Sequence, residues 1–151
     1  MENRYPFELK FHHVGVFVTN INRSIQWYEY MLGFKLMFRK VFNLPEIGPT
    51  EMAWLKHGDY YIELYDLPKA IPCTHERYWG IVGTKHLCLY VKNEEFQPLI
   101  SHLESKNAKF VVRHRWPEEM LGKPGGCGVI YITDPDDIRV EIQEEFIPGE
   151  Y

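Results

Sequence analysis

The stretch Phe11-His12-His13-Val14-Gly15-Val16-Phe17-Val18 decides how the chain begins to fold. Aromatic and β-branched residues alternate in it with a period of two, a pattern typical of a half-buried β-strand. The aliphatic residues on one side of this strand are Val14, Val16 and Val18. The other side carries the imidazole of His13 next to Gly15. A single strand histidine is more often a core residue than a ligand, so its role depends on the rest of the chain.

A helix and three further strands follow this first strand. The apolar residues with helical spacing are Ile21, Ile25, Tyr28 and Leu32, and Gly33 comes directly after them as a helix stop. Strands are predicted over 34–42, 51–56 and 60–66, and the tight turn His57-Gly58-Asp59 joins the last two. The first half of the chain is therefore predicted to be a βαβββ unit.

The same order of elements returns in the second half. A strand is predicted over 86–91, then a helix capped by Asn93 and ending near Asn107, then strands over 108–114, 127–133 and 138–144. Residues 67–83 are irregular and rich in large side chains, so we interpret them as a crossover that also lines a site. This duplication predicts one α+β domain over 1–151, with module one at about 8–66 and module two at about 84–145.

The composition excludes two classes of partner. A formal net charge of -4 provides no basic surface for nucleic acid or for an acidic membrane. No apolar run approaches the roughly 20 residues that span a bilayer, and Met1–Pro6 has no apolar core of a signal peptide. The three cysteines have no metal-motif spacing, which is typical of a reducing compartment. We therefore expect a cytoplasmic protein without a nucleic-acid or membrane partner.

Two imidazoles and two carboxylates share the non-aliphatic side of their strands. His13 and Glu63 lie in the first and last strands of module one, and His86 and Glu141 hold the same places in module two. This donor set suits one divalent ion, and it does not choose among Zn²⁺, Ni²⁺, Co²⁺, Mn²⁺ and Fe²⁺. The alternative interpretation is two buried histidines and two glutamates that end edge strands. We predict the metal site.

The chain resembles the vicinal oxygen chelate (glyoxalase/bleomycin resistance/dioxygenase) superfamily over roughly residues 8–145. The matching motifs are His13-Val14-Gly15-Val16, Leu32-Gly33-Phe34, Tyr61-Ile62-Glu63-Leu64, Lys85-His86-Leu87 and Asp134-Pro135-Asp136 with Val140-Glu141. The resemblance implies two tandem βαβββ modules that form an incomplete barrel around a metal. It is nearest to the glyoxalase I and methylmalonyl-CoA epimerase branches, since both carry a ligand on the fourth strand. Asp137 departs from the glycine that the family usually has in that turn.

The predicted function is that of an isomerase, epimerase or lyase that moves a proton next to a carbonyl group of a small metabolite. The metal would act as a Lewis acid, and Glu141 or Glu63 would act as the base. An extradiol-type Fe²⁺ dioxygenase with His13, His86 and Glu141 as ligands is an alternative, against which Glu63 counts as a fourth ligand. A non-catalytic antibiotic-binding protein is another alternative, against which the four intact ligands count.

Further residues are assigned to the substrate and to the surface. Arg139 lies on the predicted site face two residues from Glu141, so it is a candidate for binding a substrate anion and favours Glu141 as the base. The predicted pocket wall includes Tyr61 and Tyr90. Three side chains near the site are interpreted as structural or solvated: His12 as packed or capping, Cys88 as a buried thiol and His75 as a loop histidine. No signature of glutathione or coenzyme A binding is present.

We also expect a homodimer. Open half-barrels of the family that the chain resembles often pair, and the aromatic residues expected to be exposed are Trp54, Trp79 and Trp116.

Overall fold

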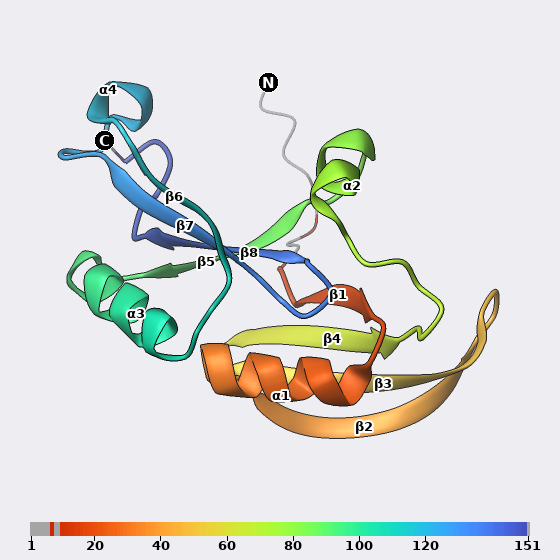
Figure 1. Cartoon of the computed structure of the whole chain (residues 1–151). Helices are drawn as coiled ribbons and strands as arrows, with labels where there is room; N and C mark the ends of the chain where they lie inside the picture. Colours follow the sequence, from red (N-terminus) through yellow and green to blue (C-terminus); the bar gives the residue numbers. More distant parts are fainter. Residues whose placement is uncertain (1–6, 8–9, 151) are drawn as a thin grey trace.

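The computed structural model of the chain describes residue 7 and residues 10–150 (Figure 1). Met1–Pro6, which were expected to contain no signal peptide, lie outside the described residues, as do residues 8 and 9 at the expected start of module one. Two βαβββ units follow each other along the described chain, and each has its own four-stranded mixed sheet. The expected α+β class and the pairing of two modules are confirmed.

The first unit has the strand order β1-β4-β3-β2. Its elements are β1 (His13–Val18), α1 (Ile21–Leu32), β2 (Lys35–Leu44), β3 (Gly48–His57) and β4 (Tyr60–Asp66). β1 runs parallel to β4, and the other neighbouring strands are antiparallel. β2 and β3 extend beyond the predicted limits because they continue as a two-stranded ribbon, which projects from the sheet in Figure 1.

The second unit repeats this topology in the order β5-β8-β7-β6. Its elements are β5 (His86–Val91), α3 (Asn93–Ser105), β6 (Phe110–Trp116), β7 (Cys127–Thr133) and β8 (Arg139–Glu144). Two short helices were not predicted, namely α2 (His75–Gly80) in the crossover and α4 (Glu118–Leu121) before β7. The predicted cap at Asn93 is wrong, because α3 begins at that residue and its amide oxygen accepts a hydrogen bond from Lys123 Nζ at 2.8 Å.

Local signals in the sequence explain both ends of α1. The side chain of Asn20 accepts a hydrogen bond from the backbone N–H of Arg23, which satisfies one of the free donors at the helix start. Gly33 adopts a left-handed conformation with φ 68°, and its N–H donates to the carbonyl of Glu29. This conformation favours glycine, so the helix ends where the sequence predicts.

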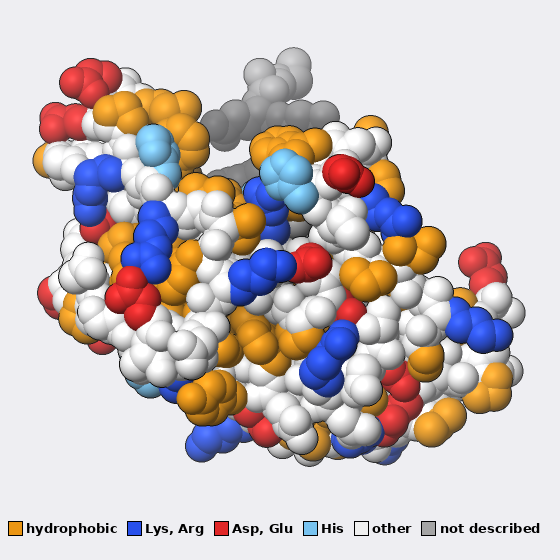
Figure 2. All heavy atoms as spheres, viewed as in Figure 1, with side chains coloured by type: hydrophobic (Ala, Val, Ile, Leu, Met, Phe, Trp, Pro, Cys, Tyr) orange, Lys and Arg blue, Asp and Glu red, His pale blue; other side chains and the backbone are white. Residues whose placement is uncertain are grey.

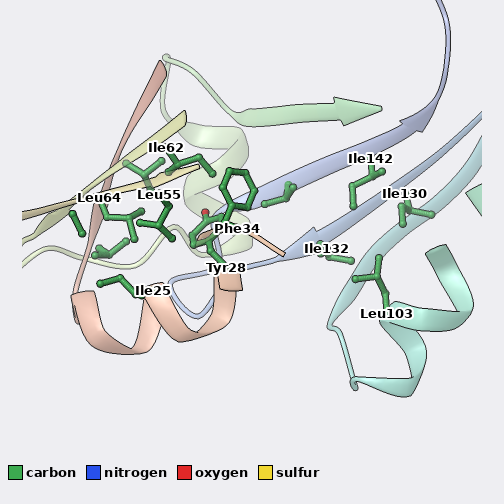
Figure 3. Close-up of a cluster of buried hydrophobic side chains, with 14 of the residues drawn as sticks. Ile25, Tyr28, Phe34, Leu55, Ile62, Leu64, Leu103, Ile130, Ile132 and Ile142 are labelled. Atoms are coloured by element: carbon green, nitrogen blue, oxygen red, sulfur yellow. The ribbon is translucent and has the colours of Figure 1, made fainter. Parts of the chain in front are cut away.

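The aliphatic sides of both sheets pack against the helices and form one core across the two units (Figure 3). Among its fully buried members are Tyr28, Leu55, Leu64, Leu103, Ile130, Ile132 and Ile142. The two sheets stay separate in the described residues, where β1 is at one edge of the first sheet and β5 at one edge of the second. They do not close into a barrel. None of the helices in the described part of the chain is long and apolar enough to cross a membrane. On the face drawn in Figure 2, acidic and basic side chains are interspersed.

The turn between β7 and β8 joins the second unit to α1. Asp136 accepts hydrogen bonds from the backbone N–H of Thr19 at 2.9 Å and from the guanidinium of Arg23 at 2.7 Å. Tyr28 donates its hydroxyl to Asp134, and burial raises the pKa of Asp134 to about 6 against the lowering effect of two backbone N–H donors. Asp137 adopts φ 61°, so an aspartate occupies the left-handed position that usually holds glycine.

Candidate functional site

The four predicted ligands form two pairs of nearly equal geometry. His13 Nε2 lies 3.2 Å from a carboxylate oxygen of Glu63, and His86 Nε2 lies 2.8 Å from one of Glu141. The side-chain exposures are 35% and 10% in the first pair and 34% and 11% in the second. The internal duplication therefore extends from the topology to the side chains of the candidate site.

Strand pairing accounts for this geometry. In each unit the first strand runs parallel to the last, so that Gly15 is the register partner of Glu63 and Cys88 is that of Glu141. The histidine lies two residues earlier on the same face of the same strand. Its ring reaches the glutamate diagonally across the ladder, and both side chains point away from the helix-covered side of the sheet.

Aromatic side chains surround the first pair. The ring of His13 lies 4.7 Å from that of Trp54, and its Nδ1 lies 2.8 Å from Nδ1 of His12. His12 stacks on Tyr61 at a centroid distance of 5.4 Å. Two predictions are corrected here. His12 is exposed and contacts His13 instead of packing on the aliphatic side, because β1 begins only at His13. Trp54, which was expected to be exposed, is half-buried because it packs against both histidines.

The second pair is held partly by the crossover. The hydroxyl of Tyr78 in α2 lies 3.2 Å from Nδ1 of His86, and Tyr131 in β7 meets the His86 ring edge-on. No sequence pattern distinguishes Tyr78 from its neighbours, although the abundance of large side chains in the crossover does indicate that this segment lines a site. In both pairs, therefore, Nε2 faces the glutamate while Nδ1 contacts a second group, the arrangement that orients metal-binding histidines.

Neighbouring hydroxyls and a thiol stay protonated beside the two glutamates. Burial, followed by the hydrogen bond and negative charge of Glu63, raises the pKa of Tyr65 to about 12. Burial and then the charge of Glu141 raise the pKa of Tyr131 as well. Cys88 is an exposed residue, contrary to the prediction of a buried thiol, yet desolvation of its sulfur and the Glu141 charge raise its pKa to about 12.

Each pair has the spacing of two ligands on one ion. Ligand atoms with metal bonds of about 2.0–2.2 Å lie roughly 3 Å apart when they occupy adjacent coordination positions. The two measured separations agree with this value. However, no three or more His, Cys, Asp and Glu side chains among the described residues are grouped so that they could hold one ion. The four predicted ligands are thus brought together as two half-sites and not as one site within the chain.

A hollow of about 420 Å³ opens at the first half-site and does not contain the second. It is lined by His13, Gly15, Phe17, Leu44, Glu63 and Tyr65. A different cavity of about 340 Å³ lies between the two units, where Tyr90 and His57 contribute to its wall. Tyr90, which was predicted to line the substrate pocket, therefore faces this inter-unit cavity, and none of the four predicted ligands does.

The predicted substrate residues Tyr61 and Arg139 hold equivalent positions in the two units. Tyr61 is the register partner of His13, and Arg139 is that of His86. Arg139 is only 6% exposed, and its guanidinium carbon lies 3.6 Å from the centre of the Tyr78 ring. Its Nη2 also lies 3.3 Å from Nδ1 of His75, which begins α2 and was interpreted from the sequence as a solvated loop histidine.

Comparison with known proteins identifies relatives of this fold. A glyoxalase family protein from Enterococcus faecalis shares 21% identity over 89% of this chain and 97% of its own, with a TM-score of 0.69. The fosfomycin resistance protein FosX from Listeria monocytogenes, in complex with Mn(II) and sulfate, shares 10% identity over 93% of this chain and 96% of its own, with a TM-score of 0.63. A glyoxylase/bleomycin resistance protein/dioxygenase domain from Frankia sp. EAN1pec shares 19% identity over 96% of each chain, with a TM-score of 0.68.

No curated protein matches the chain. At these identities the solved structures establish a common fold and no more. The family model of the Glyoxalase/Bleomycin resistance protein/Dioxygenase superfamily matches residues 10–142, nearly all of the described chain. The chain therefore belongs to the glyoxalase/bleomycin resistance protein/dioxygenase superfamily.

Proposed function

We propose that the protein is a divalent-metal-dependent isomerase, epimerase or lyase that transfers a proton next to a carbonyl group. The observation that carries the proposal is the duplicated His–Glu pair, with Nε2 about 3 Å from a carboxylate oxygen and Nδ1 in contact with a second group in both units. Imidazole and carboxylate are ligands that divalent first-row ions accept. An isolated pair of this kind would be too few ligands for a stable site.

The metal site is proposed to form between two copies of the chain. The β1–β4 half of one copy would supply His13 and Glu63, and the β5–β8 half of the other would supply His86 and Glu141. Two features support this arrangement: the half-sites of one chain are not grouped around one ion, and both histidines are about one third exposed. Trp79 and Trp116, which are 71% and 36% exposed, offer apolar area for the contact.

A bound divalent ion would supply electrostatic stabilisation of negative charge on a carbonyl oxygen. The remaining tasks fall to the chain. Glu141 accepts the proton, and its position between the hydroxyl of Tyr131 and the imidazole of His86 holds the carboxylate in place. Arg139, two residues before Glu141 on the same face of β8, orients an anionic substrate. Glu63 lies next to His13 just as Glu141 lies next to His86, which favours four protein ligands. An extradiol dioxygenase would use only three.

Metal analysis of matched variants tests the proposal. Wild type, His13→Ala and His86→Ala are loaded with Mn²⁺, Zn²⁺, Ni²⁺, Co²⁺ or Fe²⁺, desalted and measured by elemental analysis. His102→Ala is the control, since this exposed histidine lies in α3 and lines the inter-unit cavity, which none of the four predicted ligands lines. We expect both site variants to lose most of the metal and the control to retain it. Equal metal in all four proteins would refute the proposal.

A further inference from the structure

A second hollow lies at the end of the sheet of the second unit, beside the His86–Glu141 pair. Its volume is about 310 Å³, and its wall includes His75, Lys109, Thr133, Asp137 and Arg139. Three of these five side chains carry nitrogen donors, and one carries a carboxylate. Lys109 neutralises that carboxylate, since its Nζ lies 2.6 Å from an oxygen of Asp137. The positive charge of Arg139 is not neutralised by a carboxylate in the wall of this hollow.

Arg139 has no carboxylate partner among the described residues. Four other arginines that are more exposed each pair with a carboxylate, namely Arg23, Arg39, Arg113 and Arg115. Arg139 instead stacks on Tyr78 and approaches the Trp79 ring and His75. A guanidinium has five N–H donors, and a buried one without a counter-ion is unfavourable. The stacking holds the guanidinium in place while most of its donors remain available to a ligand.

Thr133 supplies a second unsatisfied group at the same place. It is the register partner of Arg139, so the two side chains lie on the same face of neighbouring strands. Thr133 is 6% exposed, and its hydroxyl has no hydrogen-bond partner within the described part of the chain. Buried hydroxyls are almost always paired, so the Thr133 hydroxyl is a donor that can turn toward an anion held by the neighbouring Arg139.

We infer that this hollow binds an oxyanion, the carboxylate or phosphoryl group of the substrate, through Arg139 and Thr133. Arg139 precedes Glu141 by two residues on one strand face, a spacing of roughly 7 Å. An anion held there would place the rest of a small molecule at the His86–Glu141 pair. The identity of the substrate, a small anionic carbonyl compound, rests on the proposed function. Binding of an anion at Arg139 and Thr133 can be tested without any metal.

The test measures binding of inorganic phosphate and of acetate to the full chain by calorimetry, in the presence of a chelator so that no metal-bound anion contributes. Chloride and neutral acetamide serve as reference ligands. Arg139→Gln is expected to weaken binding by about tenfold or more, because it removes a charge-assisted hydrogen bond. Preference for phosphate or for acetate distinguishes a phosphoryl from a carboxylate substrate.

Thr133→Val keeps the test valid if Arg139→Gln does not fold. It replaces an unpaired buried hydroxyl by a methyl group of similar size, so the fold is retained while anion binding falls severalfold. Ser24→Ala is the matched control, since Ser24 carries the other buried hydroxyl without a partner among the described residues and lies in α1. Anion binding that is unchanged in the variants at Arg139 and Thr133 would overturn the inference. Normal anion binding in a protein that holds no metal would instead refute only the proposed function.

Discussion

The two βαβββ units keep the same pair of candidate ligands but surround it with different residues. The distances and side-chain exposures of His13–Glu63 and His86–Glu141 nearly coincide. Across the ladder from the histidine, however, the first unit has Tyr61 and the second has Arg139. Under the proposed function, the residues that are duplicated are those that would share one ion, and the residues that differ are those that would meet the charged end of the substrate.

The contacts between the units show the same asymmetry. The β7–β8 turn of the second unit binds α1 directly through Asp134 and Asp136. The corresponding β3–β4 turn of the first unit, at His57, faces α3 across a cavity of about 340 Å³. One contact is therefore a buried polar network and the other is largely open.

The largest effect is expected from mixing two inactive variants. If each site takes one half from each of two chains, a hybrid dimer of His13→Ala and His86→Ala contains one site with both defects and one intact site. Random exchange makes about half of the dimers hybrids, so the mixture should regain about a quarter of the wild-type metal and activity. Elemental analysis before and after mixing measures this. No recovery, or a mass of 18.0 kDa at all concentrations, would show that the halves do not combine between chains.

The next effect separates the two glutamates. Glu141→Gln preserves size and an oxygen ligand but cannot accept a proton, so it should retain metal and lose about 10²–10⁴ in the rate of proton exchange. Deuterium exchange into pyruvate, followed by NMR, reports this step. Glu46→Gln in the exposed turn between β2 and β3 is the control. If only Glu63→Gln lowers the rate of proton exchange, the base is Glu63 in the first unit instead.

The smallest effect concerns the two turns. The pKa of Asp134 is raised by burial from 3.8 to about 6, so the folded state binds a proton more tightly than the unfolded state does. This contribution to stability is present at low pH and is lost as the pH rises from about 4 to above 6. Asp134→Asn keeps the acceptor for the backbone N–H groups of Asp136 and Ile138 and removes the charge.

Between pH 4.5 and pH 7.5 the variant should therefore gain stability relative to wild type, by about 2 kcal/mol. Urea unfolding at the two pH values measures the difference. Asp59→Asn, in the exposed turn of the first unit, should show no such dependence on pH. If the free energies of unfolding of Asp134→Asn and wild type differ by the same amount at both pH values, the pKa of Asp134 is not raised in the folded state.

The duplicated fold could be predicted from the sequence because its signals are local. Alternation in β1 and helical spacing in α1 depend only on neighbouring residues, and Gly33 ends the helix through its own backbone freedom. Strand parity likewise placed His13, Glu63, His86 and Glu141 on the faces away from the helices. The two short helices were missed because each has fewer than two full turns, which leaves no periodicity to detect.

The order of the elements and the strand faces that carry the candidate ligands follow from the residues along the chain, as do the equivalent positions of these ligands in the two units. Tertiary packing, by contrast, keeps the two pairs apart in one chain and brings Tyr78 against His86. It also sets Thr133, whose hydroxyl has no hydrogen-bond partner among the described residues, beside Arg139. These facts depend on contacts between residues far apart in the chain. Such contacts follow from how the sheets and the crossover pack together, and no local pattern of residues encodes them.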